Sequence, residues 1–285
     1  MPLLGEASDD EVPPLARLRL AITVAAVTLG SSLQFGFATG ALNNLEQTAP
    51  SSLAAAGSPI SLAEWSAIVG GFGIGGLLGS VIATLLCQQF GRKAVLLLNN
   101  GFVLTSSLLF VFGTSFDVLF GARVLVGVAA GIATGVVPLY FGEICPSSAR
   151  AIVGTTHQLG ISVGLVLSQA LTTPAFCPLG DARHWRLVFL VPMGCAALEL
   201  LVLPWCPESP AYLYKTRGSA AALSSLATLH STASASGHID LLRCEMVDRG
   251  FASWTVPALF RAPELRKQLL VGVASRAGGN ERACP

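Results

Sequence analysis

The sequence predicts an all-α membrane protein organised around six transmembrane helices. Charged residues make up 12% of the 285-residue chain and apolar residues 52%, whereas a soluble domain has about 25% charged residues. The apolar residues gather in six long runs with almost no charge, each near the roughly 20 residues that a helix needs to cross about 30 Å of hydrocarbon. A soluble protein with six buried helices is disfavoured, because a core helix seldom stays apolar over this length.

The six predicted spans follow one another closely along the chain. The first run contains one charge, Arg19, at its start, the fourth begins directly after Arg123, and the sixth contains Glu199. The second, third and fifth runs contain no charge. We therefore expect transmembrane helices at residues 18–42, 66–87, 94–113, 119–141, 152–173 and 187–206.

The charges between the spans predict orientation, because Lys and Arg concentrate in cytoplasmic loops. One set of connecting segments is basic and holds Arg17, Arg19, Arg92, Lys93, Arg150, Lys215 and Arg217. The opposite segments hold Glu46, Glu64 and Asp117, and Arg183 and Arg186 go against the rule. We expect both ends of the six-helix bundle at 18–206 to lie in the cytoplasm, preceded by a cytoplasmic tail at 1–17.

Composition disfavours several classes of function. The 17 basic and 16 acidic residues give a net charge of +1. The chain therefore lacks the excess of basic residues that binding to nucleic acid requires. The seven cysteines are scattered, so neither a disulfide framework nor a metal site is predicted. No carboxylate pair or Ser–His–Asp set is placed at membrane depth. We expect no catalytic residues, no metal and no cofactor, and the chain is not predicted to be an enzyme.

Small and polar residues inside the spans are more specific. Glycines recur every four residues at 71, 75 and 79, at 127, 131 and 135, and at 160 and 164, a spacing that lets helix backbones approach closely. Phe35, Thr39 and Asn43 also lie four apart, so one helix face would present a ring, a hydroxyl and an amide. Such groups suit an uncharged polyol such as a sugar, while hydrogen bonding between helices is the alternative for any one of them.

Six motifs, in order, resemble those of the facilitative glucose transporters, the sugar-porter branch of the major facilitator superfamily. They are LQFGFATGALN at 33–43, FGRK at 90–93, GAR at 121–123, PLYFGE at 138–143, HQLGI at 157–161 and LPWCPESP at 203–210. The resemblance implies the six-transmembrane-helix N-terminal half of a major facilitator fold, plus a short helical cytoplasmic segment.

The resemblance also implies roles for particular residues. It places Phe35, Thr39, Asn43, Gln158 and Ile161 around a hexose, with Gln158 as the main hydrogen-bonding residue of this half. Ser162 stands where the family has Val, which implies an altered substrate preference.

A second implied set forms ion pairs on the cytoplasmic side. Arg92, Glu143, Arg150 and Glu208 match charges that tie the two halves of the family's fold together in the outward-facing state. Gln88, Gln89, Ala151 and Ala211 depart from the family pattern. With fewer charges, the resemblance implies a weaker inner gate.

Beyond the sixth span we expect a cytoplasmic helical linker at 207–268, with short helices at 220–229 and 241–247. Residues 261–274 resemble the lead into a seventh helix and its start, whereas 275–285 are polar and unlike any span. Six apolar residues cannot cross a bilayer. The expectation is therefore an aborted seventh helix and an atypical tail at 269–285.

Two functional hypotheses follow. The first is a facilitative (uniport) hexose transporter of the plasma membrane, which moves sugars of the glucose or fructose class by alternating access without ion coupling. Glu199 lies near the end of its helix, and no membrane carboxylate is placed for a proton relay. The second is a truncated, non-transporting isoform that associates with or modulates full-length transporters through homo- or hetero-association. In both hypotheses the chain is a multi-pass integral protein whose surroundings are the lipid bilayer.

Overall fold

The computed structural model describes residues 13–229, apart from the side chains of residues 147, 148 and 178. Every regular element within that range is helical. The elements in chain order are α1 (Pro14–Val27), a π-helical turn (Thr28–Ser32), α2 (Leu33–Gly40), a 3-10 turn (Asn43–Leu45), α3 (Thr48–Ala55), α4 (Leu62–Phe90), α5 (Arg92–Phe112), α6 (Phe116–Ile144), α7 (Ser147–Thr172), 3-10 turns at Pro178–Gly180 and Trp185–Phe189, α8 (Leu190–Val202), a 3-10 turn (Leu203–Trp205), α9 (Pro210–Arg217) and α10 (Ser219–Ala227).

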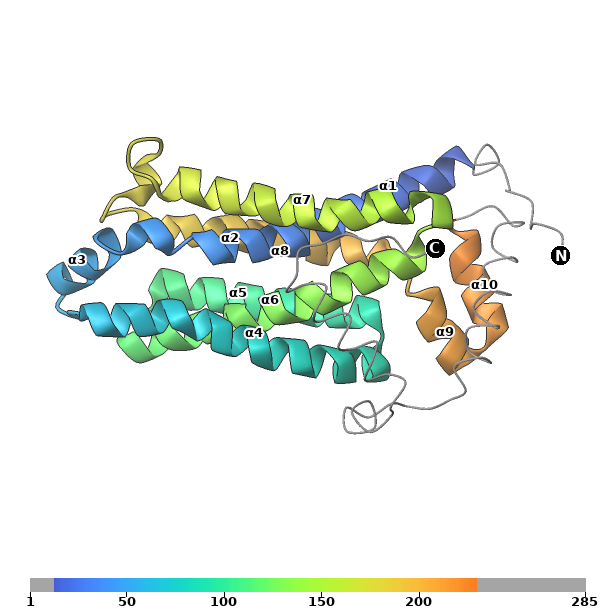
Figure 1. Ribbon diagram of the computed structural model, residues 1–285, viewed down its shortest axis with the longest axis horizontal. Coiled ribbons are helices and arrows are strands. Elements are labelled where there is room, and N and C mark those ends of the chain that lie inside the picture. The colour runs from blue at the N-terminus through green and yellow to red at the C-terminus, as the bar shows by residue number, and fades with distance from the viewer. Residues whose placement is uncertain (1–12, 230–285) are drawn as a thin grey trace, which may run out of the picture. The chain divides into compact units, whose positions relative to one another are not determined.

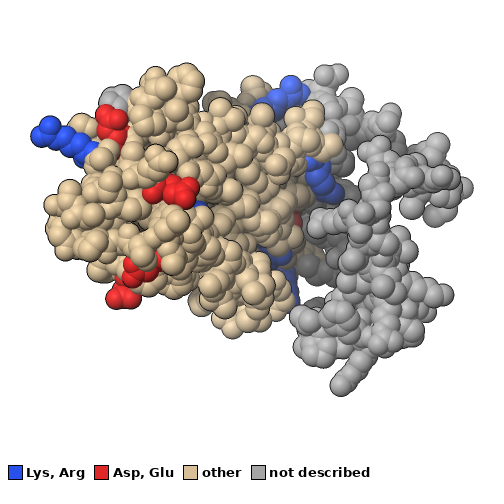
Figure 2. All heavy atoms as spheres, turned by 60° about the vertical axis from the view of Figure 1, so that its left-hand side comes forward, with Lys and Arg blue, Asp and Glu red and all other residues tan. Residues whose placement is uncertain are grey.

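Six helices or helical runs in this range are long and apolar enough to span a membrane, which confirms the predicted number. They are Pro14–Leu45, Leu62–Phe90, Arg92–Phe112, Phe116–Ile144, Ala149–Thr172 and Trp185–Trp205. Most of them extend beyond the predicted bounds, since polar and charged residues continue the helices past the apolar runs. Figure 2 shows charged side chains gathered toward the ends of the visible face, with an uncharged band between them. This band suits contact with lipid.

The first span is not one continuous α-helix. It changes to a π-helical turn at Thr28–Ser32 and, after Gly40, to a 3-10 turn at Asn43–Leu45. The second break alters the face on which Asn43 lies, so uniform α-helical spacing does not extend from Thr39 to Asn43. The connection between the first and second spans also contains a helix, α3 (Thr48–Ala55), which was not predicted.

Close packing of α4 against α6 explains most of the spaced glycines. A Cβ atom built on Gly75 would lie 2.0 Å from the carbonyl oxygen of Val124, and one on Gly131 would lie 2.2 Å from that of Gly76. These distances leave no room for a side chain, so the glycines are required for backbone contact. Gly135 is different, because a Cβ atom there would meet nothing within 4 Å.

The parallel helices α2 and α7 pack against each other along their length (Figure 1). A Cβ atom on Gly36 would lie 1.9 Å from the carbonyl oxygen of Ile161, and one on Gly164 would lie 2.1 Å from that of Leu33. Farther along, Asn44 donates hydrogen bonds to α7. These contacts bring residues about 125 positions apart side by side, and they position the candidate site.

After α8 the chain forms two short helices. α10 agrees with the helix predicted at 220–229, whereas α9 was not predicted separately. The helix predicted at 241–247, the remainder of the 207–268 linker and the segment 269–285 lie outside the described residues.

Candidate functional site

A narrow uncovered stripe on α2 carries the first half of the candidate site. From Gly30 to Leu42 every residue is buried except Phe35, which is partly exposed, and Thr39, which is exposed. Asn43 follows in the 3-10 turn and is also exposed. The sequence-predicted ring, hydroxyl and amide therefore lie on the open side of the first span. The Thr39 hydroxyl donates to the Phe35 carbonyl at 2.9 Å, while its oxygen retains capacity to accept a hydrogen bond.

The second half lies on α7, beside this stripe. Gln158 and Ser162 are exposed and Ile161 is partly exposed, and Ile161 meets α2 at Gly36. The Ser162 hydroxyl donates to the Gln158 carbonyl at 3.0 Å. Within residues 13–229, no hydrogen bond joins the side-chain amide of Gln158 or Asn43 to another residue. Both amides are therefore available to an external hydrogen-bonding partner.

Other polar residues of the spans hold helices together, as the alternative reading of the sequence expected. The amide of Asn44 donates to the side-chain oxygens of Gln169, Thr172 and Thr173 at 3.1–3.2 Å. His157 Nδ1 lies 2.7 Å from the hydroxyl oxygen of Ser32. These groups are consumed in packing, which separates them from the exposed Asn43 and Gln158.

Arg123 is buried on α6 and faces the first span. Its guanidinium donates to the Ala38 carbonyl at 2.7 Å and lies 4.6 Å from the centroid of the Phe72 ring. The ring centroids of Phe72 and Phe35 are 6.4 Å apart, and the two rings are stacked. Phe72 was missed in the sequence, although it interrupts the glycine-rich part of its helix. The chain of contacts fixes the ring of Phe35 from behind.

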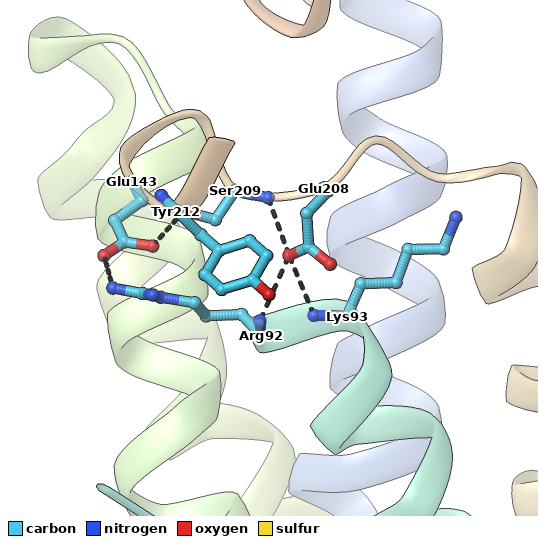
Figure 3. A network of polar contacts seen from close by, with 6 residues as sticks. All are labelled: Arg92, Lys93, Glu143, Glu208, Ser209 and Tyr212. Carbon is cyan, nitrogen blue, oxygen red and sulfur yellow. Dashed lines mark hydrogen bonds and ion pairs between the residues drawn. The ribbon is translucent and has the colours of Figure 1, made fainter. Parts of the chain in front are cut away.

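A polar network joins three segments at the end of the bundle that carries α9 (Figure 3). Arg92 pairs with Glu143 at 2.7 Å, and the Ser209 hydroxyl donates to the other oxygen of that carboxylate. Glu208 accepts hydrogen bonds from the backbone N–H groups of Arg92, Lys93 and Ser209 at 2.9–3.1 Å. A carboxylate at the start of α5 is stabilised there by the helix dipole. The network fastens the end of α6 and the α8–α9 connection to the α4–α5 turn.

Gly91 makes this arrangement possible. Its φ of +87° is a left-handed conformation that side chains disfavour, and a Cβ atom there would lie 2.9 Å from Glu208 and 2.8 Å from Tyr212. Of the predicted gating charges, Arg92, Glu143 and Glu208 are thus brought together. Arg150 is exposed and has no ion pair with another described residue.

Two cysteines near this end, Cys145 and Cys206, have thiols whose pKa is raised. Burial raises the pKa of the Cys145 thiol to about 11, although Arg150 opposes the shift. Burial also raises the pKa of Cys206, against a hydrogen bond from Thr23 and the charge of Lys93. Both thiols are therefore less ionised at neutral pH than a free cysteine.

The fold is shared with a solved membrane transporter of the major facilitator superfamily. This chain is similar to the solved structure of the proton:xylose symporter XylE bound to 6-bromo-6-deoxy-D-glucose. The superposition has a TM-score of 0.73 at 19% sequence identity, and it covers 86% of this chain and 56% of XylE. At this identity the likeness establishes the fold.

Sequence comparison then identifies the family. The model described as "Sugar (and other) transporter" matches residues 23–280. The facilitated glucose transporter member 4 of Mus musculus is 34% identical over 228 residues, covering 74% of this chain and 44% of the relative. Member 5 of Homo sapiens is 34% identical over 271 residues, covering 88% and 54%. The chain belongs to the sugar transporter family, and it spans about half the length of the curated relatives it matches.

Proposed function

We propose that this protein is a facilitative hexose transporter whose described bundle supplies one wall of the sugar pathway. The relatives are glucose transporters by name, and the uncovered stripe on α2 and α7 carries the groups that a sugar requires. Phe35 offers a ring face for stacking, while Thr39, Asn43 and Gln158 offer a hydroxyl and two amides. Ile161 supplies apolar contact between them.

The single observation that carries the proposal is the division of polar residues into two groups. Asn44, Gln169 and His157 are spent on contacts between helices, whereas Asn43 and Gln158 keep free amides on an open face. An amide at membrane depth is costly unless it meets a partner or a wet cavity. A hydrated sugar pathway meets this requirement.

Downhill uniport fits the charges on this wall. Among the residues of the stripe there is no acidic side chain, and the buried carboxyl group of α8, Glu199, lies within the bundle, in contact with Ser31. We further propose that the end bearing Arg92, Lys93 and α9 faces the cytoplasm and that the protein resides in the plasma membrane. Basic residues at that end support this orientation.

Uptake of radiolabelled hexose by proteoliposomes tests the proposal. The wild-type chain is expected to give saturable uptake of D-glucose or D-fructose that L-glucose does not inhibit. Gln158→Ala should lower the uptake by about 5- to 160-fold, because one lost hydrogen bond to a buried polar group is worth about 1–3 kcal/mol. Thr105→Ala is the matched control, since Thr105 is exposed on α5 and bonded to its own helix. Equal uptake by the two variants would contradict the assignment of Gln158.

A second candidate function is association with full-length transporters, and a groove favours it. The groove has a volume of about 900 Å³ and is bounded by apolar residues of α1 and α7, among them Val24, Leu29, Ile152 and Leu159. The groove lies on the same two spans as the open stripe, the first and the fifth, but on α1 and the π-helical turn rather than on the stripe of α2. Under this alternative the chain alone gives no saturable flux. It then co-purifies with a full-length transporter co-expressed with it and changes the flux of that transporter.

A further inference from the structure

Glu199 is a buried carboxyl group that the proposed sugar pathway does not use. The residue is 1% exposed on α8, and its side chain lies against Gly30 in the π-helical turn of the first span. A Cβ atom on Gly30 would lie 2.1 Å from Oε2 of Glu199, so only glycine leaves room for the carboxyl group. Glu199 lies in the last turn of α8, near the end of its helix as predicted, and it packs against Gly30 in the middle of the first span.

Two polar side chains, Ser31 and Asn100, contact this carboxyl group; both can donate to its carboxylate form, and the contacts with Ser31 also leave room for a bound proton. The hydroxyl oxygen of Ser31 lies 3.0 Å from one carboxyl oxygen and 2.9 Å from the other, and the amide of Asn100 also faces the group. A serine hydroxyl has one proton to donate. When the carboxyl is protonated, each of the two contacts with Ser31 receives a proton of its own.

The surroundings supply no compensating positive charge. The titratable groups described that interact electrostatically with Glu199 are Cys195 on α8, Tyr140 on α6 and Cys206 after α8, and none of them is a cation. His157 on α7 is engaged by Ser32, the neighbour of Ser31. Within residues 13–229, Glu199 makes no ion pair. A buried carboxylate without a counter-charge is strongly disfavoured, and such groups take up a proton instead.

A small cavity, lined mostly by alanine and valine, lies between Ser31, the hydrogen-bond partner of Glu199, and the partly exposed Phe35 of α2. Its volume is about 10 Å³, close to the minimum for one water molecule, and its lining includes Ser31, Gln34, Phe35 and Asn99. The side-chain oxygens of Gln34 and Asn99 are buried without a hydrogen-bond partner. One water in the cavity would donate to both oxygens and would link Ser31 to the side of Phe35.

We propose that Glu199 is a proton-binding site of the bundle, protonated at neutral pH and in exchange with the open face through Ser31 and one cavity water. On release, the carboxyl O–H bond breaks, the proton passes to the water, and the resulting carboxylate accepts a hydrogen bond from Ser31. The site joins α8 to the π-helical turn, so its ionisation loosens that contact. The inference concerns the bundle itself and does not rest on hexose transport.

Infrared spectroscopy of the full chain in lipid tests the proposal directly. At pH 7 the wild-type protein should show a carboxylic-acid C=O band that Glu199→Gln removes. Glu46→Gln is the matched control, because Glu46 is exposed in the connection after the first span, and it should retain the band. If wild type and Glu199→Gln show the same absorption in the carboxylic-acid C=O region at pH 7, Glu199 is ionised and the proposal is wrong.

Two further measurements do not depend on that variant's folding. Raising the pH should lower the thermal unfolding midpoint while the folded state holds a proton that the unfolded state has lost, and this fall should level off at the pH where the wild-type band disappears. Ser31→Ala should keep the band at pH 7 but raise the pH at which it disappears, because the carboxylate loses a donor. A wild-type band that does not titrate with the midpoint, or one that responds to sodium at fixed pH, overturns the proposal.

Discussion

The contact between α4 and α6 makes a quantitative prediction for Gly75→Ala. A Cβ atom on Gly75 would lie 2.0 Å from the carbonyl oxygen of Val124 and 2.8 Å from the backbone nitrogen of Val128. Both neighbours are backbone atoms of α6, so no side chain can rotate away. The two helices have to separate along their shared face to admit one methyl group.

The expected loss is the difference between two opposing effects. Replacing glycine by alanine in a helix interior gains about 1 kcal/mol from propensity, whereas overpacking a well-packed contact costs about 1–3 kcal/mol. Because the obstruction is backbone, the upper part of that range applies, and the free energy of unfolding should fall by about 1–2 kcal/mol. For a bundle of this size the thermal midpoint falls by about 2–8 °C.

Thermal unfolding in detergent, followed by circular dichroism, measures this change. Gly135→Ala is the control, since Gly135 is exposed on the same α6 and a Cβ atom there meets nothing within 4 Å. It should leave the midpoint unchanged or raise it slightly. A fall of similar size in both variants, or in neither, would refute the reasoning that backbone contact between α4 and α6 requires glycine.

Three further predictions address other parts of the bundle. Arg92→Gln should lower the free energy of unfolding by about 1–3 kcal/mol, because Glu143 loses its charged donor. Arg217→Gln is the control, since Arg217 is exposed at the end of α9, and it should leave the free energy of unfolding unchanged. Equal thermal midpoints for the two variants would contradict the role of the Arg92–Glu143 pair. Asn44→Ala should lower the free energy of unfolding by about 0.6 kcal/mol or more per hydrogen bond lost, while Gln47→Ala, at an exposed position just beyond it, should leave it unchanged; equal free energies for the two variants would contradict the role of Asn44. Alkylation of Cys145 by maleimide, measured by mass spectrometry, should be slower at pH 7 than alkylation of free cysteine. The rate should increase as the pH rises toward the pKa of Cys145, about 11. A rate at pH 7 equal to that of free cysteine would contradict the burial of Cys145.

Much of the fold follows from local patterns in the sequence. Apolar run length located all six spans, and the four-residue glycine spacing predicted close backbone approach between helices, though not that α4 and α6 are the pair that meets. The breaks in the first span could not be predicted this way, because the π-helical turn at Thr28–Ser32 packs against α8, far along the chain. α3 was missed because Thr48–Ala55 is short and only weakly apolar.

The candidate site was predicted less completely. Phe35, Thr39, Asn43 and Gln158 all lie at open or partly open positions, but the break after Gly40 removes the uniform helical spacing expected between Thr39 and Asn43, and their contact with sugar remains a prediction. Pattern alone could not separate Asn43 from its neighbour Asn44, since the partners of Asn44 lie about 125 residues away on α7. The burial of Glu199 against Gly30 likewise depends on packing between distant helices.

Protection of Thr39→Cys against alkylation by hexose tests the central claim most directly. The variant is reconstituted in liposomes, treated with a membrane-impermeant maleimide, and read by mass spectrometry at position 39, with Thr105→Cys on α5 as the control. If α2 and α7 form a wall of the sugar pathway, D-glucose or D-fructose slows alkylation at position 39 and L-glucose does not, while position 105 is unaffected. Alkylation at position 39 that is indifferent to every hexose, or protection that is equal at both positions, would contradict the account.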